Sequence, residues 1–423
     1  MDSSMEPSKL VGNDTAGLIG REISNLEGSL EYNAPAEDEL FNSTVLDARD
    51  MRRMGKSQEL IRHYRLDSMV AFAGLAGPAW ELALFQVTPG IINGGLPMLI
   101  YSNIWCFVGF LPVVLSLAEM ASMAPIAGAQ YHWVSEFAPE KYQKLLSYLT
   151  GWTATLSYQA GNATGFILIG TLIQSIILLN KPDYGFPNWQ ATLLAIAAIV
   201  FVILCNYFGS RLLPRWQNPA FAIHILAYLA FLVPVWKNAP KASAKQVWTE
   251  IENRGGWSSL PLSIMIGQFP AIAAQTTVDA ALHMSEEVRD ASRSIPKVIV
   301  SIYMINFVLN LTTVLTICYH ITSVQDALDD PTSYPAVYVI AQAMSIKWVS
   351  VLLAVIVALI LVASVSYFVA VSRQLYAFSR DRGIPFSRWV SKIDQGRHIP
   401  TNAYILSGVI SVLLSLIYIV LYL

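Results

Sequence analysis

The sequence predicts an all-α protein that crosses a membrane several times, and three observations support this. The 423-residue chain is 54% hydrophobic and only 13% charged, with a mean hydropathy of +0.48, a balance typical of polytopic membrane proteins. Apolar runs of about 20 residues, the length that crosses a bilayer as a helix, recur along the chain. Two of these runs are interrupted by glycine and proline.

Nine apolar runs are long enough to span a membrane. They are residues 69–88, 96–123, 145–179, 189–207, 220–236, 260–283, 298–320, 348–378 and 403–423. The preceding residues 1–66 are polar, and we expect them to form a largely disordered cytosolic tail in front of a membrane core at 67–423. No apolar core follows a charged start, so we expect no cleavable signal peptide, and the first span serves as its own signal anchor.

The distribution of lysine and arginine predicts the orientation of these spans. If the N-terminus is cytosolic, the chain places 21 of its 27 Lys and Arg residues on the cytosolic side and six outside. Most of them lie in short loops, where an excess of positive charge marks the inner side of a membrane. The sequence therefore predicts a multi-pass protein with a cytosolic N-terminus.

The first span is broken in the middle by Gly74, Gly77 and Pro78, and an acid, Glu81, follows the break. Proline cannot donate the helical hydrogen bond, and glycine adds backbone freedom. In lipid, the freed backbone groups must be buried in protein or line a watery cavity. The break therefore predicts a binding site.

The sixth span, residues 260–283, carries Gly267 and Pro270 near its middle. A matched pair of interrupted spans indicates a binding site near the bilayer midplane. The candidate binding residues around the two breaks are Ala76, Gly77, Ala79, Trp80, Glu81, Gly267, Gln268, Phe269 and Ala271. The simpler interpretation is that these glycines and prolines only kink helices for packing.

The two breaks suggest different chemistry. Free amides near Gly77 and Ala79 are suited to a carboxylate, and the backbone of residues 267–271 to an amine or a coupling ion. Trp80 offers an aromatic face to a quaternary ammonium, or simply packs between helices.

Three acids are candidates for a functional role. Glu81 is the candidate for proton coupling, because an ionisable group inside a span is costly and desolvation favours its neutral form. It could equally pair with an amine. Asp279 and Glu119 lie near the inner ends of their spans, where gating and structural pairing are both open.

Several classes of function find no support in the sequence. No basic stripe with interleaved aromatic residues indicates nucleic acid, and no phosphate-binding glycine loop indicates ATP-driven pumping. His132, His224 and His320 are isolated, and the three cysteines are scattered within apolar runs, so we expect no metal site. No nucleophile, base and orienting residue can be assembled, so we expect neither an enzyme nor a cofactor.

Five strings in the sequence are specific when taken together. They are SLAEMASMAPIAGAQYHWVSEFAP (116–139), KYQKLLSYLTGW (141–152), GGWSS (255–259), HMSEEVRDAS (283–292) and SRQLYAFSRDRGIPFS (372–387). This set resembles the fungal amino acid/choline transporter family of the amino acid–polyamine–organocation (APC) superfamily, which includes GABA and choline permeases. The resemblance runs from about residue 67 to the last residue.

The resemblance implies two inverted repeats of five helices, with spans one and six broken around a central site, and two further helices. The first repeat then covers about 67–236 and an incomplete second repeat about 258–423, and we expect the last three of twelve spans to be missing. The implied activity is secondary active transport of an amino acid or a related amine such as GABA across the plasma membrane, driven by a proton gradient. The alternatives are a choline or organic cation permease, and a non-transporting sensor or truncated remnant. The sequence sets no oligomeric state.

Overall fold

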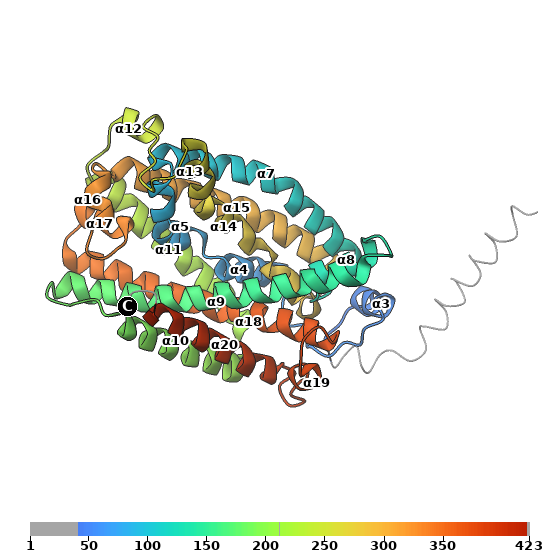
Figure 1. Cartoon of the computed structure of the whole chain (residues 1–423). Helices are drawn as coiled ribbons and strands as arrows, with labels where there is room; N and C mark the ends of the chain where they lie inside the picture. Colours follow the sequence, from blue (N-terminus) through green and yellow to red (C-terminus); the bar gives the residue numbers. More distant parts are fainter. Residues whose placement is uncertain (1–40, 211, 421–423) are drawn as a thin grey trace, which may run out of the picture.

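The computed structural model describes residues 41–210 and 212–420, and its architecture is helical in these ranges (Figure 1). Eight segments of the described chain are long and apolar enough to cross a membrane. The first consists of three short consecutive helices, α4 (Leu66–Ala76), α5 (Ala79–Phe85) and α6 (Thr88–Ile92). The other seven are α7 (Gly95–Met123), α9 (Gln143–Asn180), α10 (Asn188–Gly209), α11 (Leu213–Asn238), α15 (Ala291–His320), α18 (Ile346–Arg380) and α20 (Thr401–Val420).

The remaining expected span, residues 260–283, is divided into three pieces. They are α13 (Leu260–Gly267), α14 (Phe269–Thr276) and the 3-10 helix η1 (Thr277–Glu287). No single one of them is long enough to cross a bilayer. The expected helix bundle with broken first and sixth spans is therefore confirmed.

The spans of the two expected repeats pack against their counterparts. α7 packs on α15, α9 on α18 and α10 on α20, which pairs the second, third and fourth spans of one repeat with those of the other. The two broken spans also meet, since α4 contacts η1 and α5 contacts α14. This pairing fits the inverted repeats expected for the family and brings the two breaks together between the longer helices.

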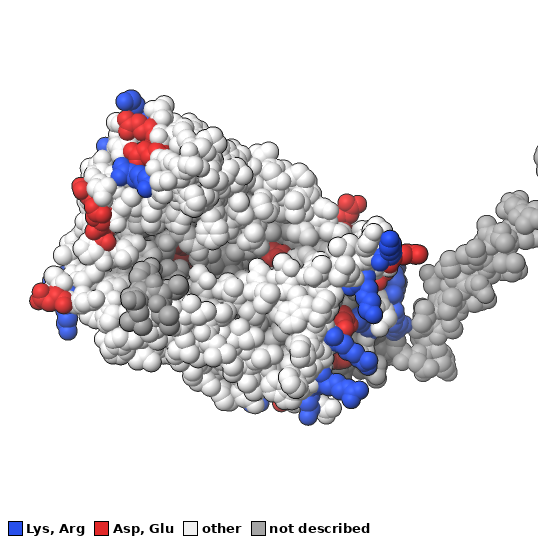
Figure 2. Space-filling view, in the orientation of Figure 1, with Lys and Arg blue, Asp and Glu red and all other residues white. Residues whose placement is uncertain are grey.

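Short helices cover both ends of this bundle (Figure 1). One end carries α3 (Val45–Arg53), α8 (Gln130–Phe137) and α19 (Ser387–Val390), and the opposite end carries α12 (Ala244–Trp248), α16 (Val324–Leu328) and α17 (Pro335–Ala343). In the space-filling view, Lys and Arg gather at the first of these ends (Figure 2). We call the end formed by α3, α8 and α19 the basic end.

The N-terminal segment was expected to be a largely disordered tail over residues 1–66. Residues 1–40 lie outside the described residues. Residues 41–65 contain α3, whose side chains Asp47, Asp50 and Met51 are buried. Thr44 caps this helix by accepting a hydrogen bond from the backbone N–H of Asp47 at 3.2 Å, a polar side chain in the role that helix starts favour. This part of the segment is therefore packed against the bundle.

Candidate functional site

The first break lies at Gly77 and Pro78, between α4 and α5. Both residues leave the helical conformation, with ψ angles of 75° and 83°. The freed Gly77 carbonyl accepts a hydrogen bond from Asn306 Nδ2 of α15 at 3.4 Å. A Cβ atom at residue 77 would lie 2.5 Å from Thr277 Oγ1. Glycine is therefore what allows the first break to touch the second broken span.

The second broken span changes conformation at two points. At Gln268, where α13 meets α14, the backbone departs only slightly from a helix, with φ −77° and ψ −4°. At Thr277, α14 gives way to 11 residues of 3-10 helix, a length that is uncommon and often marks a hinge. The sequence placed the functional break at 267–271, whereas the contact with Gly77 is made by Thr277. This contact arises from tertiary packing. No glycine or proline beside Thr277 marks it in the sequence.

A cavity of about 410 Å³ lies beside the two breaks. Its walls come from α4 and α5, from α9, from α14 and η1, and from α18. Most of the lining is apolar, with polar side chains from Gln86, Ser157, Asn162, Thr164, Thr276, Thr277, Ser364 and Tyr367. Its volume lies in the range of small-molecule sites. We call it the central cavity.

Two further cavities continue from the central cavity in opposite directions. One, of about 480 Å³, shares Ser157, Thr276, Thr277 and Tyr367 with it and reaches Asp279 and Gln130, the first residue of α8. The other, of about 400 Å³, shares Gln86, Thr164 and Leu168 with it and reaches Tyr334 just before α17. The space-filling view in Figure 2 shows a long hollow across the face of the molecule that is turned to the viewer. The three cavities thus form a series along α9, with the central cavity in the middle.

The predicted binding residues divide between the central cavity and the packing around it. Ala76 and Phe269 line the cavity, and so does Pro78 of the first break. Gly77 provides the close approach of Thr277. Ala79 is buried at the start of α5. The helix break therefore lies where the sequence predicted it, at Gly77 and Pro78, while most of the cavity lining comes from α9 and α18. The binding role of these residues stays a prediction.

Trp80 and Glu81 lie on another side of α5, against α11. The Trp80 ring is completely buried and stacks on Phe231 at a centroid distance of 6.1 Å, with Tyr228 at 5.7 Å. Neither Trp80 nor Glu81 lines the central cavity. The expectation that Trp80 offers a face to a quaternary ammonium is not met in this structure, because neighbouring rings cover it.

Glu81 has a basic partner on α11. Its Oε1 atom lies 2.8 Å from Nδ1 of His224, and both residues are buried. This pairing could not be predicted from the sequence, since His224 is the only Asp, Glu, Lys, Arg or His residue of the predicted fifth span, 220–236. A carboxyl group therefore faces an imidazole between α5 and α11, with both side chains buried.

The residues predicted around the second break pack outside the central cavity, apart from Phe269. Gly267 lies against the backbone of Asn93, where a Cβ atom would overlap the carbonyl oxygen. Gln268 Oε1 accepts a hydrogen bond from Trp105 Nε1 at 3.1 Å. Ala271 is buried at 1% exposure. Gly267 and Gln268 therefore position the broken span against α6 and α7.

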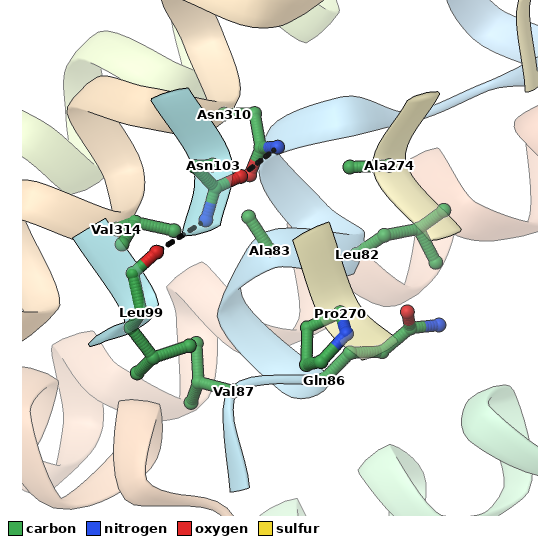
Figure 3. Close-up of a pocket in the computed structure, with 10 residues that line it drawn as sticks. All are labelled: Leu82, Ala83, Gln86, Val87, Leu99, Asn103, Pro270, Ala274, Asn310 and Val314. Atoms are coloured by element: carbon green, nitrogen blue, oxygen red, sulfur yellow. Dashed lines mark hydrogen bonds between the residues drawn. The ribbon is translucent and has the colours of Figure 1, made fainter. Parts of the chain in front are cut away.

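A small space of about 10 Å³ separates α5 from α14, next to α7 and α15. Figure 3 shows the residues around this space, with Gln86 and Pro270 toward one side and the hydrogen-bonded Asn103 and Asn310 toward another. Asn310 Nδ2 donates to Asn103 Oδ1 at 2.8 Å, and Asn103 Nδ2 donates to the Leu99 carbonyl at 2.7 Å. The space has room for about one water molecule, so the two broken spans are close neighbours here.

The two acids predicted near the inner ends have different surroundings. Asp279 lies at the start of η1 and lines the cavity that reaches α8. It accepts hydrogen bonds from Tyr158 OH at 2.7 Å and from Gln130 Nε2 at 2.9 Å. Glu119 is exposed near the end of α7, and no ion pair found among the described residues involves it.

A buried network at the basic end joins α18 to η1. Arg380 Nη2 and Nη1 donate to the two carboxylate oxygens of Glu286 at 2.7 and 2.9 Å, and Arg373 pairs with Glu287. Burial alone would raise the pKa of Glu286, but the charge and hydrogen bonds of Arg380, with the Ala127 N–H, hold this pKa below its usual range. These ion pairs therefore fix the C-terminal part of η1 against α18 at the basic end.

The N-terminal segment joins the same network through Arg62, which is 1% exposed. Arg62 Nη1 donates to the Ser285 carbonyl at 2.9 Å and lies 3.5 Å from Asp47 Oδ1. Asp47 in turn accepts from the backbone N–H groups of Asp290 and Ala291, both at 3.0 Å, at the start of α15. This contact could not be predicted from the sequence, because more than 200 residues separate Arg62 and Asp47 from their partners on η1 and α15.

The geometry defines the class of protein. A helical membrane bundle whose two broken spans face a common cavity has the architecture of a secondary transporter. The model of the amino acid permease family matches residues 69–422. The chain belongs to this family of transporters, and the expectation that it is not an enzyme is confirmed.

Relatives with known names agree with this assignment. The chain is 27% identical to a protein of Macrophomina phaseolina whose name proposes an amino acid/polyamine transporter, over 83% of this chain. It is 26% identical to the GABA-specific permease and to the choline transporter of Saccharomyces cerevisiae, over 88% and 96% of this chain. The chain spans 78%, 66% and 72% of the lengths of these three relatives.

Proposed function

We propose that this chain carries a small compound with an ammonium and a carboxylate group, such as GABA or another amino acid, across the plasma membrane by alternating access. The observation that carries the proposal is the convergence of both broken spans on the central cavity, whose volume of about 410 Å³ suits a compound of this size. The similarity to a GABA-specific permease supports the same class of substrate. In this proposal, the substrate lies between Pro78, Thr277 and α9.

We further propose that the basic end faces the cytosol. Its excess of Lys and Arg is what the inner side of a membrane protein carries. Release to the cytosol would then require η1 to separate from α18, where Glu286 and Arg380 now hold them together. Because η1 is a 3-10 helix joined to α14 at Thr277, we assign Thr277 as the hinge of this movement.

Proton coupling is proposed for the buried pair of Glu81 and His224. Glu81 follows the first break directly, so a change in its protonation would act on α5 beside the substrate. His224 is 2.8 Å away and can hold the proton when Glu81 is ionised. The driving force in this proposal is a proton gradient, and no other cofactor is required.

A choline or organic cation substrate is the second candidate, and one observation favours it. Tyr158 and Tyr367 stack with a centroid distance of 5.5 Å and an interplanar angle of 13° beside the cavities. Tyrosine faces attract quaternary ammonium groups, and one relative is named a choline transporter.

The test is uptake of labelled GABA, a panel of amino acids and choline in permease-deficient yeast expressing the chain. We expect saturable uptake of one of these compounds. Gly165 lines the central cavity with open space beside it, so Gly165→Trp fills the cavity and should abolish uptake. The matched control is Gly109→Trp, since Gly109 also has open space but lies on α7 away from the cavity. Absence of uptake from a chain that reaches the plasma membrane would contradict the proposal.

A further inference from the structure

Asp279 differs from the other acids of η1 in how its charge is balanced. Glu286 and Glu287 each form an ion pair with an arginine of α18. No lysine, arginine or histidine forms an ion pair with Asp279 in the part of the chain that the structure describes. Its carboxylate is held only by the neutral donors Tyr158 and Gln130. The carboxylate of Asp279 is therefore held in place without an ion pair among the described residues, which leaves it free to pair with a cationic ligand.

The position of Asp279 makes that charge accessible. It lines the cavity of about 480 Å³ that adjoins the central cavity through Thr276, Thr277 and Tyr367. Among the described residues that line the three connected cavities, Asp279 is the only one with an acidic or basic side chain. For a positively charged ligand that moves along α9, Asp279 is therefore the one acid among the described lining residues.

The immediate surroundings of Asp279 provide further acceptors for an ammonium group. Each carboxylate oxygen accepts one hydrogen bond from the protein and has a second lone pair. Gln130 Oε1, on the amide that donates to Asp279, has no hydrogen-bond partner. Tyr367 lines the same cavity and stacks on Tyr158, so an aromatic ring is at hand for a cation.

We propose that Asp279, with Gln130, Tyr158 and Tyr367, forms a binding subsite for the protonated amino group of the substrate, between the central cavity and the basic end. The inference rests on the proposed function, because it assigns a second binding site to the same substrate as it is transported. The ligand class is a primary ammonium carried on a short chain. The carboxylate of the substrate has no positively charged partner in this subsite.

The test is binding to the purified full chain in lipid nanodiscs, with GABA, n-butylamine and butyrate as probes. We expect GABA and n-butylamine to bind the wild-type chain. Asp279→Asn should weaken both by about tenfold or more, as expected for a charge-assisted contact, and leave butyrate unchanged. Asp279→Glu should retain most of the affinity. Asp326→Asn removes an exposed acid on α16 and serves as the matched control.

A second pair of variants tests the subsite with Asp279 intact. Ala154 lies one turn before Tyr158 on α9 and lines the same cavity. Ala154→Lys places an ammonium group on this face and should weaken n-butylamine by about tenfold, as expected for a competing charge. Ala154→Met fills similar space without charge and should have a much smaller effect. Equal effects of Lys and Met would contradict the subsite.

The outcomes separate this inference from the proposed function. If the wild-type chain binds none of the three probes, the proposed function fails together with the subsite. If it binds GABA and n-butylamine and folded Asp279→Asn binds them equally well, only the subsite is overturned. Loss of butyrate together with the amines in Asp279→Asn would assign Asp279 a structural role and would also overturn the subsite.

Discussion

His224 of α11 lies with its Nδ1 atom 2.8 Å from Oε1 of Glu81 on α5, and both side chains are shielded from solvent. The pair joins the half-helix that follows the first break to the fifth span. Trp80, Phe221 and Tyr228 provide aromatic rings around it. The acid is therefore next to the first break but outside the central cavity, which is the position that the proposed proton coupling requires.

The first prediction concerns this pair. Glu81→Gln removes the carboxylate proposed to carry the proton but keeps the size of the side chain. We expect uptake against a gradient to be lost or to become independent of external pH, while exchange of substrate across the membrane persists, because the central cavity is unchanged. The measurement is labelled uptake over a range of external pH, compared with counterflow exchange. The control is Glu252→Gln, which removes an acid from the loop after α12. If uptake by Glu81→Gln kept the pH dependence of the wild-type chain, Glu81 would be excluded as the proton carrier.

The second prediction concerns the contact of the two breaks. Gly77→Ala places a Cβ atom 2.5 Å from Thr277 Oγ1 and 2.6 Å from Thr277 Cβ, and overpacking of this kind costs on the order of 1–3 kcal/mol. We expect lower thermal stability and reduced uptake. Removing the opposing side chain in the double variant Gly77→Ala with Thr277→Gly should restore part of both. Gly109→Ala, at a helix position with open space, should be neutral. A fully active Gly77→Ala would contradict the proposed contact.

The positions of the spans could be predicted from the sequence because hydropathy is a local property. The run 96–123 corresponds to α7 (Gly95–Met123), and 145–179 to α9 (Gln143–Asn180). The first break was also found, since Gly77 and Pro78 interrupt the helix by their own covalent structure. For these features, the identity of each residue is enough to predict the local structure, without knowledge of its partners.

What could not be predicted depends on partners far apart in the chain. The change to a 3-10 helix at Thr277 has no glycine or proline to announce it, and the contact that matters there is with Gly77. His224 is isolated in the sequence and meets Glu81 only when α11 packs against the first span. The lining of the central cavity comes mostly from α9 and α18. In the sequence, the small and polar residues of these helices cannot be distinguished from residues that only pack helices together.

The third prediction concerns the N-terminal segment. Arg62→Gln removes the charge that faces Asp47 and the hydrogen bonds to the backbone of η1. Removing one partner of a buried ion pair costs about 3–5 kcal/mol in other proteins, so we expect a lower unfolding temperature. The segment should also be released from the bundle, and trypsin should cleave near Arg52 and Arg53 at a higher rate. The control is Arg65→Gln, since Arg65 is exposed. Unchanged proteolysis would show that Arg62 does not hold the segment.

The last prediction concerns pH and the ion pair of Glu286 with Arg380. The pKa of Glu286 is lowered in the folded chain, so the pair contributes stability above the ordinary carboxyl range of roughly pH 4.3. This contribution is lost as the pH falls through the lowered pKa, because the protonated acid no longer balances the arginine. The wild-type chain should therefore lose thermal stability when the pH is lowered below this range.

Glu286→Gln isolates that contribution. The variant should be less stable than the wild-type chain at neutral pH, where it leaves Arg380 without its charged partner, and the difference between the two should shrink as the pH falls. The measurement is the unfolding temperature of both proteins in nanodiscs between neutral and acidic pH, with Glu252→Gln as the control for loss of an acid elsewhere. A difference in unfolding temperature that stays constant across the pH range would contradict the prediction. It would mean that protonation of Glu286 does not weaken the folded chain and that its ion pair with Arg380 is not the acid-sensitive contact at the basic end.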